Sequence, residues 1–230
     1  MTIAIIPARG GSKRLPKKNA RSFAGRPLIA WTIAHAQESG VCDRVVVTTD
    51  DADIAAIAAA TGGEVIHRPP ELATDTAKVA DAVVHTLDAC SETGSAPETL
   101  ILLQPTSPLR TSRDIVDAVA MHQRHNAAVV SVMPVSNRAL AWSLVERDGM
   151  VEPVLGWGVL GMRSQDLPSL FIPNGALYVV RVDQFRMHRS FYIPPLFPYV
   201  MPVERSMDID TVEDFTAAER AFRSIGMPVV

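Results

Sequence analysis

Short runs of apolar residues, many of them β-branched, alternate with amphipathic segments through much of the chain, and this alternation limits the possible folds more than any other feature. The apolar runs have the length of strands, and the segments between them carry apolar residues at helical spacing. This pattern favours an α/β fold with a doubly wound, mainly parallel sheet whose strands are buried on both faces. The expected strands are 2–6, 44–48, 64–67, 99–103, 127–133 and 177–181.

Local signals indicate where the helices begin and end. Pro27 suits the first turn of one helix, because proline lacks the N–H group that goes unpaired there. Asp50 and Asp51 stand before the next helix, which we expect to end at Gly62. A last helix is expected at 212–222.

The alternation is lost between residues 134 and 173. Trp142, Trp157 and several glycines fall there in an irregular, partly apolar stretch. We interpret the chain as one domain, 1–230, with an insertion at 134–173 that forms either a β-rich arm or an oligomer contact, since exposed aromatic surface often marks an interface.

Composition narrows the possible partners and location. The net charge of −3 does not favour binding to nucleic acid or to a membrane surface, so an anionic ligand would need a local basic cluster. Zinc binding is not expected, because the two cysteines lack metal-type spacing and the histidines are scattered. No signal peptide and no apolar run of membrane-spanning length is evident. We therefore expect a cytoplasmic protein.

A glycine-rich basic loop, 7–19, follows the first strand. It reads Pro-Ala-Arg-Gly-Gly-Ser-Lys-Arg-Leu-Pro-Lys-Lys-Asn. Adjacent glycines let backbone N–H groups turn toward one point, and the basic side chains supply the countercharge that a triphosphate needs. The loop matches neither the Walker A nor the dinucleotide pattern. A solvated turn is the alternative, but parallel sheets bind ligands beyond the carboxyl ends of their strands, and this loop lies there.

Two further loops follow strands at the same expected edge. In 68–77, Arg68 between a strand end and two prolines suits binding of a carboxylate or phosphate, whereas Thr74 or Asp75 could instead cap a helix. In 104–110, Gln104 and Thr106 offer hydrogen bonds to a base or a hydroxyl. For Arg110, a surface ion pair is the favoured interpretation.

The segment Asp208-Ile209-Asp210-Thr211 precedes the last helix. In an extended segment, carboxylates at i and i+2 project to the same side and could hold one hard divalent cation through oxygen ligands. Asp210 or Thr211 could alternatively cap the helix, and capping by Thr211 does not exclude a metal on the two aspartates.

Taken together, the motifs resemble those of the acylneuraminate cytidylyltransferase family, whose members make CMP-sialic acid and its legionaminic and pseudaminic relatives. The resemblance extends from Ile3 to the last helix. It implies a Mg²⁺-dependent enzyme in which an acceptor hydroxyl attacks the α-phosphorus of CTP and pyrophosphate leaves. The matching segments are Ala8–Lys13, Leu15-Pro16, Lys18-Asn19, Arg68–Thr76, Gln104–Arg110, Asn174–Tyr178 and Asp208–Asp210.

The resemblance also implies roles for individual residues. Lys18 would stabilise charge that develops at phosphorus, and Asp208 and Asp210 would hold Mg²⁺ and act with Lys18 in catalysis. The insertion would be a dimerisation arm, which makes a homodimer the expected assembly. Nucleotide binding is implied for Ala8, Arg9, Gly10, Gly11, Ser12, Lys13, Lys18, Asn19, Arg68 and Asp75, and acceptor binding for Gln104, Thr106, Ser107 and Asn174. Independently of the resemblance, Arg163 in the insertion is a candidate to hold an acceptor carboxylate, either in its own chain or across a dimer.

The sequence departs from the family at its acceptor end. Phe171-Ile172-Pro173 stands before Asn174 where an arginine is usual, and Arg138-Ala139 replaces a common His-Pro pair. CTP and Mg²⁺ are therefore firmer expectations than sialic acid. The alternatives are CMP transfer to another small acid such as a phosphonate, a nucleotide-binding protein without catalysis, and a sugar-1-phosphate nucleotidyltransferase that uses another base.

Overall fold

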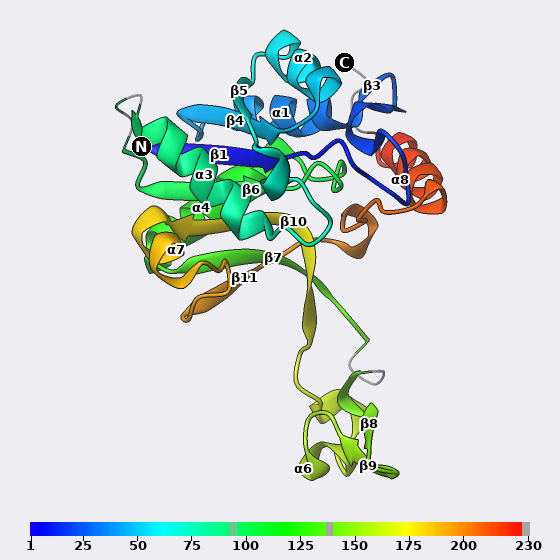
Figure 1. Ribbon diagram of the computed structural model, residues 1–230. Helices are drawn as coiled ribbons and strands as arrows, with labels where there is room; N and C mark the ends of the chain where they lie inside the picture. Colours follow the sequence, from blue (N-terminus) through cyan, green and yellow to red (C-terminus); the bar gives the residue numbers. More distant parts are fainter. Residues whose placement is uncertain (93, 95, 137–139, 227–230) are drawn as a thin grey trace.

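The structure is a computed structural model, and it describes residues 1–230 except 93, 95, 137–139 and 227–230. Seven strands form the central sheet in the order β11-β7-β10-β6-β1-β4-β5 (Figure 1). Most neighbours are parallel, and β10 alone runs antiparallel, between β6 and β7. The expected mainly parallel α/β fold is confirmed. The strands are β1 (Thr2–Pro7), β4 (Arg44–Thr49), β5 (Glu64–His67), β6 (Thr99–Leu103), β7 (Ala128–Pro134), β10 (Phe171–Arg181) and β11 (Leu196–Val200).

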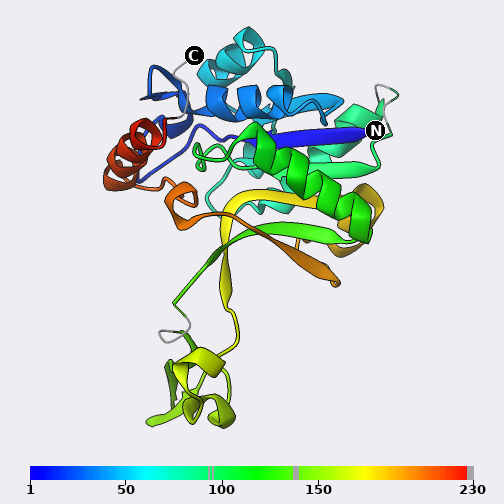
Figure 2. The same cartoon turned by 180° about the vertical axis from the view of Figure 1, so that it is seen from behind.

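Helices cover both faces of the sheet, which explains why its central strands are apolar at nearly every position. In β1, Ala4 and Ile6 belong to the apolar cluster on one face, and Ile3 and Ile5 belong to the cluster on the other. Figures 1 and 2 show the two sides from opposite directions. One face carries α1 (Leu28–Glu38), α2 (Ala52–Ala60) and α4 (Ser112–His125), and the other carries α3 (Val79–Glu92) and α7 (Val182–His188).

The expected helix boundaries are confirmed for α1 and α2. Helix α1 begins directly after Pro27. The Asp51 carboxylate caps α2 by accepting a hydrogen bond of 2.9 Å from the Ile54 N–H. Beyond the end of α2, Gly62 adopts a φ of 79°, a left-handed conformation that favours glycine.

Strand β11 was not expected from the sequence. It contains Pro198, which cannot donate a ladder hydrogen bond and which argues against a central strand. β11 lies at the edge of the sheet, parallel to β7, where such a residue is tolerated. Strand β10 is also longer than the predicted 177–181, because its first half leaves the sheet together with the end of β7.

These two strand ends lead into an arm that projects from the sheet (Figures 1 and 2). The arm carries unusually exposed apolar side chains: Trp157 is 68% exposed and Met150 is 66% exposed. Its elements are β8 (Leu144–Arg147), β9 (Met150–Pro153), α6 (Trp157–Leu160) and the 3-10 helix η3 (Ser164–Asp166). Arg138 and Ala139, where the sequence departs from the family, lie outside the described residues.

Helix α8 (Val212–Ser224) closes the chain and packs beside the loop that follows β1. The rings of Phe215 and Phe222 meet Phe23 edge-on at centroid distances of 5.4 and 5.5 Å. Leu15 and Ile209 belong to the same apolar cluster. The smaller elements are β2 (Ser22–Phe23), β3 (Arg26–Pro27), η1 (Lys18–Ala20), η2 (Pro70–Leu72) and η4 (Val203–Arg205).

Within the described part of the chain, none of the helices combines the length and the apolar character needed to cross a membrane.

Candidate functional site

A pocket of about 470 Å³ lies at the carboxyl ends of the central strands. The loops that follow β1, β5 and β6 form its walls together with the segment before α8, so four segments far apart in the sequence meet there. Ten of the predicted site residues line it: Arg9, Ser12, Lys13, Lys18, Asn19, Arg68, Asp75, Gln104, Thr106 and Asp210.

The pocket is strongly basic, although the protein as a whole carries a net charge of −3. Six basic and two acidic side chains line it, which suits an anion of high charge such as a triphosphate. The basic residues are Arg9, Lys13, Arg14, Lys18, Arg68 and Lys78, and the acidic ones are Asp75 and Asp210.

Asp75 holds two basic side chains of the first loop. Its carboxylate accepts a hydrogen bond of 2.9 Å from Arg9 and forms an ion pair with Lys13. The hydrogen bonds from Lys13 and Arg9 lower the pKa of Asp75, so the group is ionised at neutral pH. Helix α3 begins only at Val79, so the alternative interpretation of Thr74 or Asp75 as its cap is wrong.

Lys18 and Asp210 meet at the edge of the pocket. The Lys18 ammonium lies 3.1 Å from Asp210 Oδ1 and donates a hydrogen bond of 2.6 Å to the Ile209 carbonyl. Arg14 contacts the other carboxylate oxygen of Asp210 at 2.9 Å. Only 10% of the Lys18 side chain is exposed, so protein contacts fix its position beside the pocket.

Asp208 lies on the same segment but does not line the pocket. Burial raises the pKa of Asp208, and the neighbouring charge of Asp210 adds to the effect. Asp208 as a whole residue is nevertheless exposed to solvent. Solvent therefore reduces the energetic cost of ionising its carboxyl group.

The oxygen donors of Asp208 and Asp210 suit Mg²⁺, which proteins commonly bind through one or two carboxylates and substrate phosphates. A closed site made by protein side chains alone is not indicated. Among the described residues, no group of three or more histidine, cysteine, aspartate or glutamate side chains is arranged to hold a metal ion.

Thr211, and not Asp210, caps α8. Its hydroxyl accepts a hydrogen bond from the Asp214 N–H, and Asp214 accepts one from the Thr211 N–H. Between the two aspartates, Ile209 is fully buried and its N–H donates to the Thr106 carbonyl at 2.8 Å. Capping therefore leaves the Asp210 carboxylate free to face the pocket.

The glycines of the first loop differ in what they do. The Gly10 N–H donates to Asp50 at 3.0 Å, so this one N–H of the predicted phosphate cradle is already paired inside the protein. A Cβ on Gly10 would lie 2.5 Å from an Asp51 carboxylate oxygen, whereas one on Gly11 would meet open space. Ala8 is buried and extends the pairing of β1 by donating to the Thr48 carbonyl at 3.0 Å. These residues shape the loop without lining the pocket.

Arg68 lines the pocket but also supports its walls. The guanidinium donates a hydrogen bond of 2.8 Å to the Thr48 carbonyl and one of 3.5 Å to the Leu72 carbonyl. Both terminal nitrogens of Arg68, which were predicted to bind a carboxylate or phosphate, therefore already donate to the protein backbone. Burial lowers the pKa of Arg68. Asn19 is likewise tied to the loop, because its amide donates to the Arg9 carbonyl at 3.3 Å.

The five predicted acceptor-binding residues do not come together in one chain. Gln104 and Thr106 line the pocket, and Ser107 is fully buried behind them. Asn174 is buried and donates to Ser206 Oγ at 2.9 Å and to the Met201 sulfur. Arg163 lies on the arm, paired with Asp166 and 79% exposed. Asn174 and Arg163 therefore do not reach the pocket of their own chain.

Arg110 is not a surface ion pair, contrary to the prediction. It is fully buried and donates to the Ala176 carbonyl at 2.6 Å and to Thr32 Oγ1 at 2.9 Å. Burial lowers the pKa of Arg110 to about 10, which still leaves the guanidinium charged at neutral pH. The residue joins α1 to β10.

Three polar residues that were not among the predicted site residues also line the pocket, namely Arg14, Thr74 and Lys78. Arg14 could have been found from the basic run in the first loop. No local pattern distinguishes Thr74 or Lys78 from ordinary solvent-exposed loop residues.

Known proteins resemble this chain in sequence and in fold. A family model described as Cytidylyltransferase matches residues 3–148. The CMP-N,N'-diacetyllegionaminic acid synthase of Legionella pneumophila is 38% identical over 222 residues, which cover 95% of this chain and 94% of that protein. The N-acylneuraminate cytidylyltransferase of Streptococcus agalactiae is 36% identical over 216 residues, and the match covers 93% of this chain but only 51% of that longer protein.

A solved structure, CMP:2-keto-3-deoxy-manno-octonic acid synthetase complexed with CTP, shares the fold. The TM-score is 0.73, the sequence identity is 17%, and the match covers 97% of this chain and 99% of that one.

Proposed function

Because the chain belongs to the cytidylyltransferase family, we propose that it transfers CMP from CTP to a nonulosonic acid of the sialic, legionaminic or pseudaminic type and releases pyrophosphate. The observation that carries this proposal is the contact between Lys18 and Asp210 at the edge of a strongly basic pocket. A site that only bound nucleotide would not need a buried ammonium paired with an aspartate.

The triphosphate of CTP would lie against the basic residues of the first loop. Arg9 and Lys13 are held in place by Asp75, so they are already oriented when the nucleotide arrives. Lys18 is held by the Ile209 carbonyl and by Asp210, and its charge would act on the phosphate where negative charge develops. Gln104 and Thr106, on the neighbouring loop, would face the acceptor.

In the proposed reaction the acceptor hydroxyl oxygen forms a bond to the α-phosphorus of CTP. The bond between that phosphorus and the bridging oxygen breaks, pyrophosphate leaves with the electron pair, and the hydroxyl proton is released. Asp208 and Asp210 would hold Mg²⁺, which when bound neutralises phosphate charge and polarises the reacting oxygen. In this structure, the ion pairs with Lys18 and Arg14 balance the charge of Asp210.

We further propose a cytoplasmic homodimer that associates through the arm. Neither Cys42 nor Cys90 forms a disulfide, which suits a reducing compartment. The arm exposes a concentration of large apolar side chains that a second copy would cover. They include Leu144, Met150, Val151, Val154, Leu155 and Trp157.

Replacing Trp157 with glutamate is expected to weaken dimerisation about 30-fold, because buried tryptophans at interfaces commonly contribute about 2 kcal/mol or more. Sedimentation equilibrium across a protein concentration series measures the dissociation constant. Met187→Glu is the matched control, since Met187 is 72% exposed on α7, away from the arm. A wild-type protein that stays monomeric at every concentration would contradict the proposal.

The function itself is tested by pyrophosphate release from CTP. With Mg²⁺ present, we expect release when a nonulosonic acid is supplied, and at least about tenfold less with ATP in place of CTP. The acceptor panel should hold sialic, legionaminic and pseudaminic acids together with a phosphonate. If only the phosphonate supports turnover, the acceptor is a phosphonate and not a nonulosonic acid. CTP binding by calorimetry without release for any acceptor would indicate a binding protein instead.

A further inference from the structure

The segment between β11 and α8 carries both aspartates. Besides Lys18 and Arg14 of the first loop, which contact Ile209 and Asp210, four other parts of the fold anchor it. Three of these contacts are neutral hydrogen bonds, which tie the segment to β7, to β10 and to the loop after β6. They join Met201 N–H to the Val132 carbonyl at 2.8 Å, the Asn174 amide to Ser206 Oγ at 2.9 Å, and Ile209 N–H to the Thr106 carbonyl at 2.8 Å. The fourth contact is ionic.

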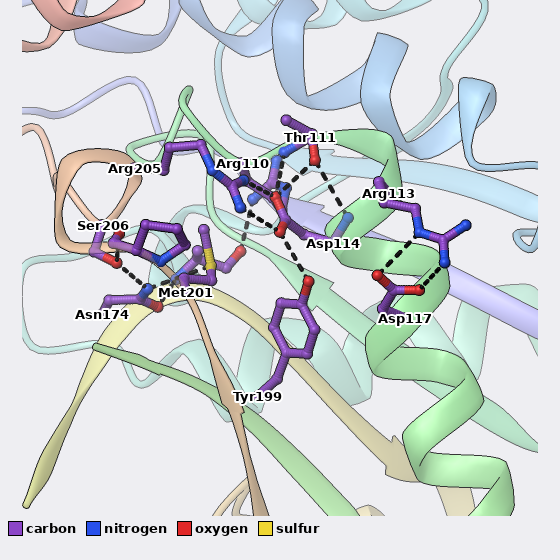
Figure 3. Close-up of polar contacts among 12 residues, drawn as sticks. Arg110, Thr111, Arg113, Asp114, Asp117, Asn174, Tyr199, Met201, Arg205 and Ser206 are labelled. Atoms are coloured by element: carbon purple, nitrogen blue, oxygen red, sulfur yellow. Dashed lines mark hydrogen bonds and ion pairs between the residues drawn. The ribbon is translucent and has the colours of Figure 1, made fainter. Parts of the chain in front are cut away.

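The ionic anchor joins Arg205 to Asp114 on α4 (Figure 3). Both terminal nitrogens of Arg205 contact the carboxylate, and the distance from Nη2 to Oδ1 is 3.0 Å. Only 2% of the Asp114 side chain and 23% of the Arg205 side chain are exposed. A buried bidentate pair of this kind fixes orientation as well as distance, because the planar guanidinium matches the carboxylate in only a few geometries.

Asp114 is itself fixed by its own helix. Its carboxylate accepts hydrogen bonds from the Thr111 N–H at 2.7 Å and from the Thr111 hydroxyl at 2.8 Å, which completes a capping box at the start of α4. Tyr199 donates a further bond of 2.9 Å from β11. Burial alone would raise the pKa of Asp114, but the bonds from Arg205 and Thr111 outweigh it and hold the pKa below its usual value.

These contacts relate the two sides of the pocket. Helix α4 directly follows the loop that holds Gln104 and Thr106, and Arg205 stands three residues before Asp208. A shift of Arg205 would therefore move the aspartates relative to that loop and to Lys18. Groups that orient metal ligands in this way commonly change metal affinity or activity by about 10–100-fold when they are removed.

We propose that Asp114 and Arg205 form a positioning pair, which sets the place of Asp208 and Asp210 relative to Lys18 and thereby tunes the binding of Mg²⁺ with CTP. This inference rests on the metal-binding role given to the two aspartates in the proposed function. Neither residue of the pair lines the pocket. Their effect passes through the backbone of residues 205–210.

The test compares Arg205→Lys and Arg205→Met with Arg113→Met. Lysine keeps the charge but loses the bidentate geometry, and methionine removes both. Arg113 is the matched control, because it forms an exposed ion pair with Asp117 on the same helix (Figure 3). Calorimetry measures Mg²⁺ binding to each protein saturated with CTP in the absence of acceptor, and thermal melting in EDTA measures the stability of the fold.

Both Arg205 variants are expected to bind Mg²⁺ about 10–100-fold more weakly, with a matching loss of kcat at fixed Mg²⁺ that excess Mg²⁺ partly restores. Arg113→Met is expected to match the wild type in both measurements. A general loss of structure would instead weaken CTP binding in EDTA as much as Mg²⁺ binding. If Arg205→Met fails to fold, Arg205→Lys alone decides.

Two results overturn the inference, and they can be told apart. If Asp210→Asn abolishes Mg²⁺ binding but Arg205→Lys keeps wild-type affinity, the positioning role is wrong and the proposed function stands. If the wild-type protein with CTP binds no Mg²⁺, the metal site of the proposed function is wrong, and the positioning role falls with it.

Discussion

Replacing Lys18 with methionine is expected to lower kcat about 10³-fold, whereas the dissociation constant for CTP should change by less than about tenfold. The ammonium is held beside the pocket by Asp210 and the Ile209 carbonyl, so it contributes fixed charge with little reorganisation during the reaction. Triphosphate binding draws on five other basic side chains in the same pocket, so losing one affects the ground state less. Pyrophosphate release and calorimetric CTP binding measure the two effects.

Lys17→Met is the matched control for Lys18. The neighbouring lysine is 74% exposed and pairs with Asp53, outside the pocket lining. We expect its kcat to stay within about threefold of wild type, because exposed ion pairs contribute about 1 kcal/mol or less. Equal losses for the two variants would mean that the first loop needs charge in general, and the specific role of Lys18 would then be wrong.

Replacing Asp210 with asparagine is expected to reduce Mg²⁺-dependent turnover by at least about 10²-fold and to leave the melting temperature within a few degrees of wild type. Asparagine removes the charge that a divalent cation requires and keeps the size of the side chain. The cap of α8 does not depend on this carboxylate, since Thr211 and Asp214 form it. Turnover across a Mg²⁺ series and thermal melting are the measurements.

Asp53→Asn provides the control for a lost carboxylate near the loop, because Asp53 is 62% exposed and pairs only with Lys17 among the ion pairs found. It should leave turnover unchanged within about threefold. If Asp210→Asn instead lowers the melting temperature strongly and the remaining folded protein is active, the aspartate is structural and the metal-binding proposal fails.

Much of the fold could be predicted from the sequence because its signals are local. Strands such as β1 are buried on both faces and are therefore apolar at consecutive positions. Capping residues and glycines marked helix ends within a few residues of where they lie. The rule that parallel sheets bind ligands at the carboxyl ends of their strands then pointed to the loops that form the pocket.

The errors have a common cause, because each concerns contacts between distant segments. Arg110 looked like a surface residue, yet it is fully buried with carbonyl and hydroxyl partners from β10 and α1. Asn174 was expected at the acceptor, and its amide instead bonds to Ser206. Strand β11 was missed because it contains Pro198. A proline is tolerated there because β11 lies at the edge of the sheet, which the sequence does not reveal.

Apolar periodicity, capping and charge are properties of neighbouring residues. They were therefore enough to predict most of the strands and helices of the main domain, the basic loop after the first strand, and the pair of aspartates before the last helix. Which of these charges meet depends on the folded arrangement of the chain. Lys18 and Asp210 are 192 positions apart, and Asp114 and Arg205 are 91 positions apart. Their contacts depend on how the sheet stacks its strands and where α8 packs, which no local pattern records.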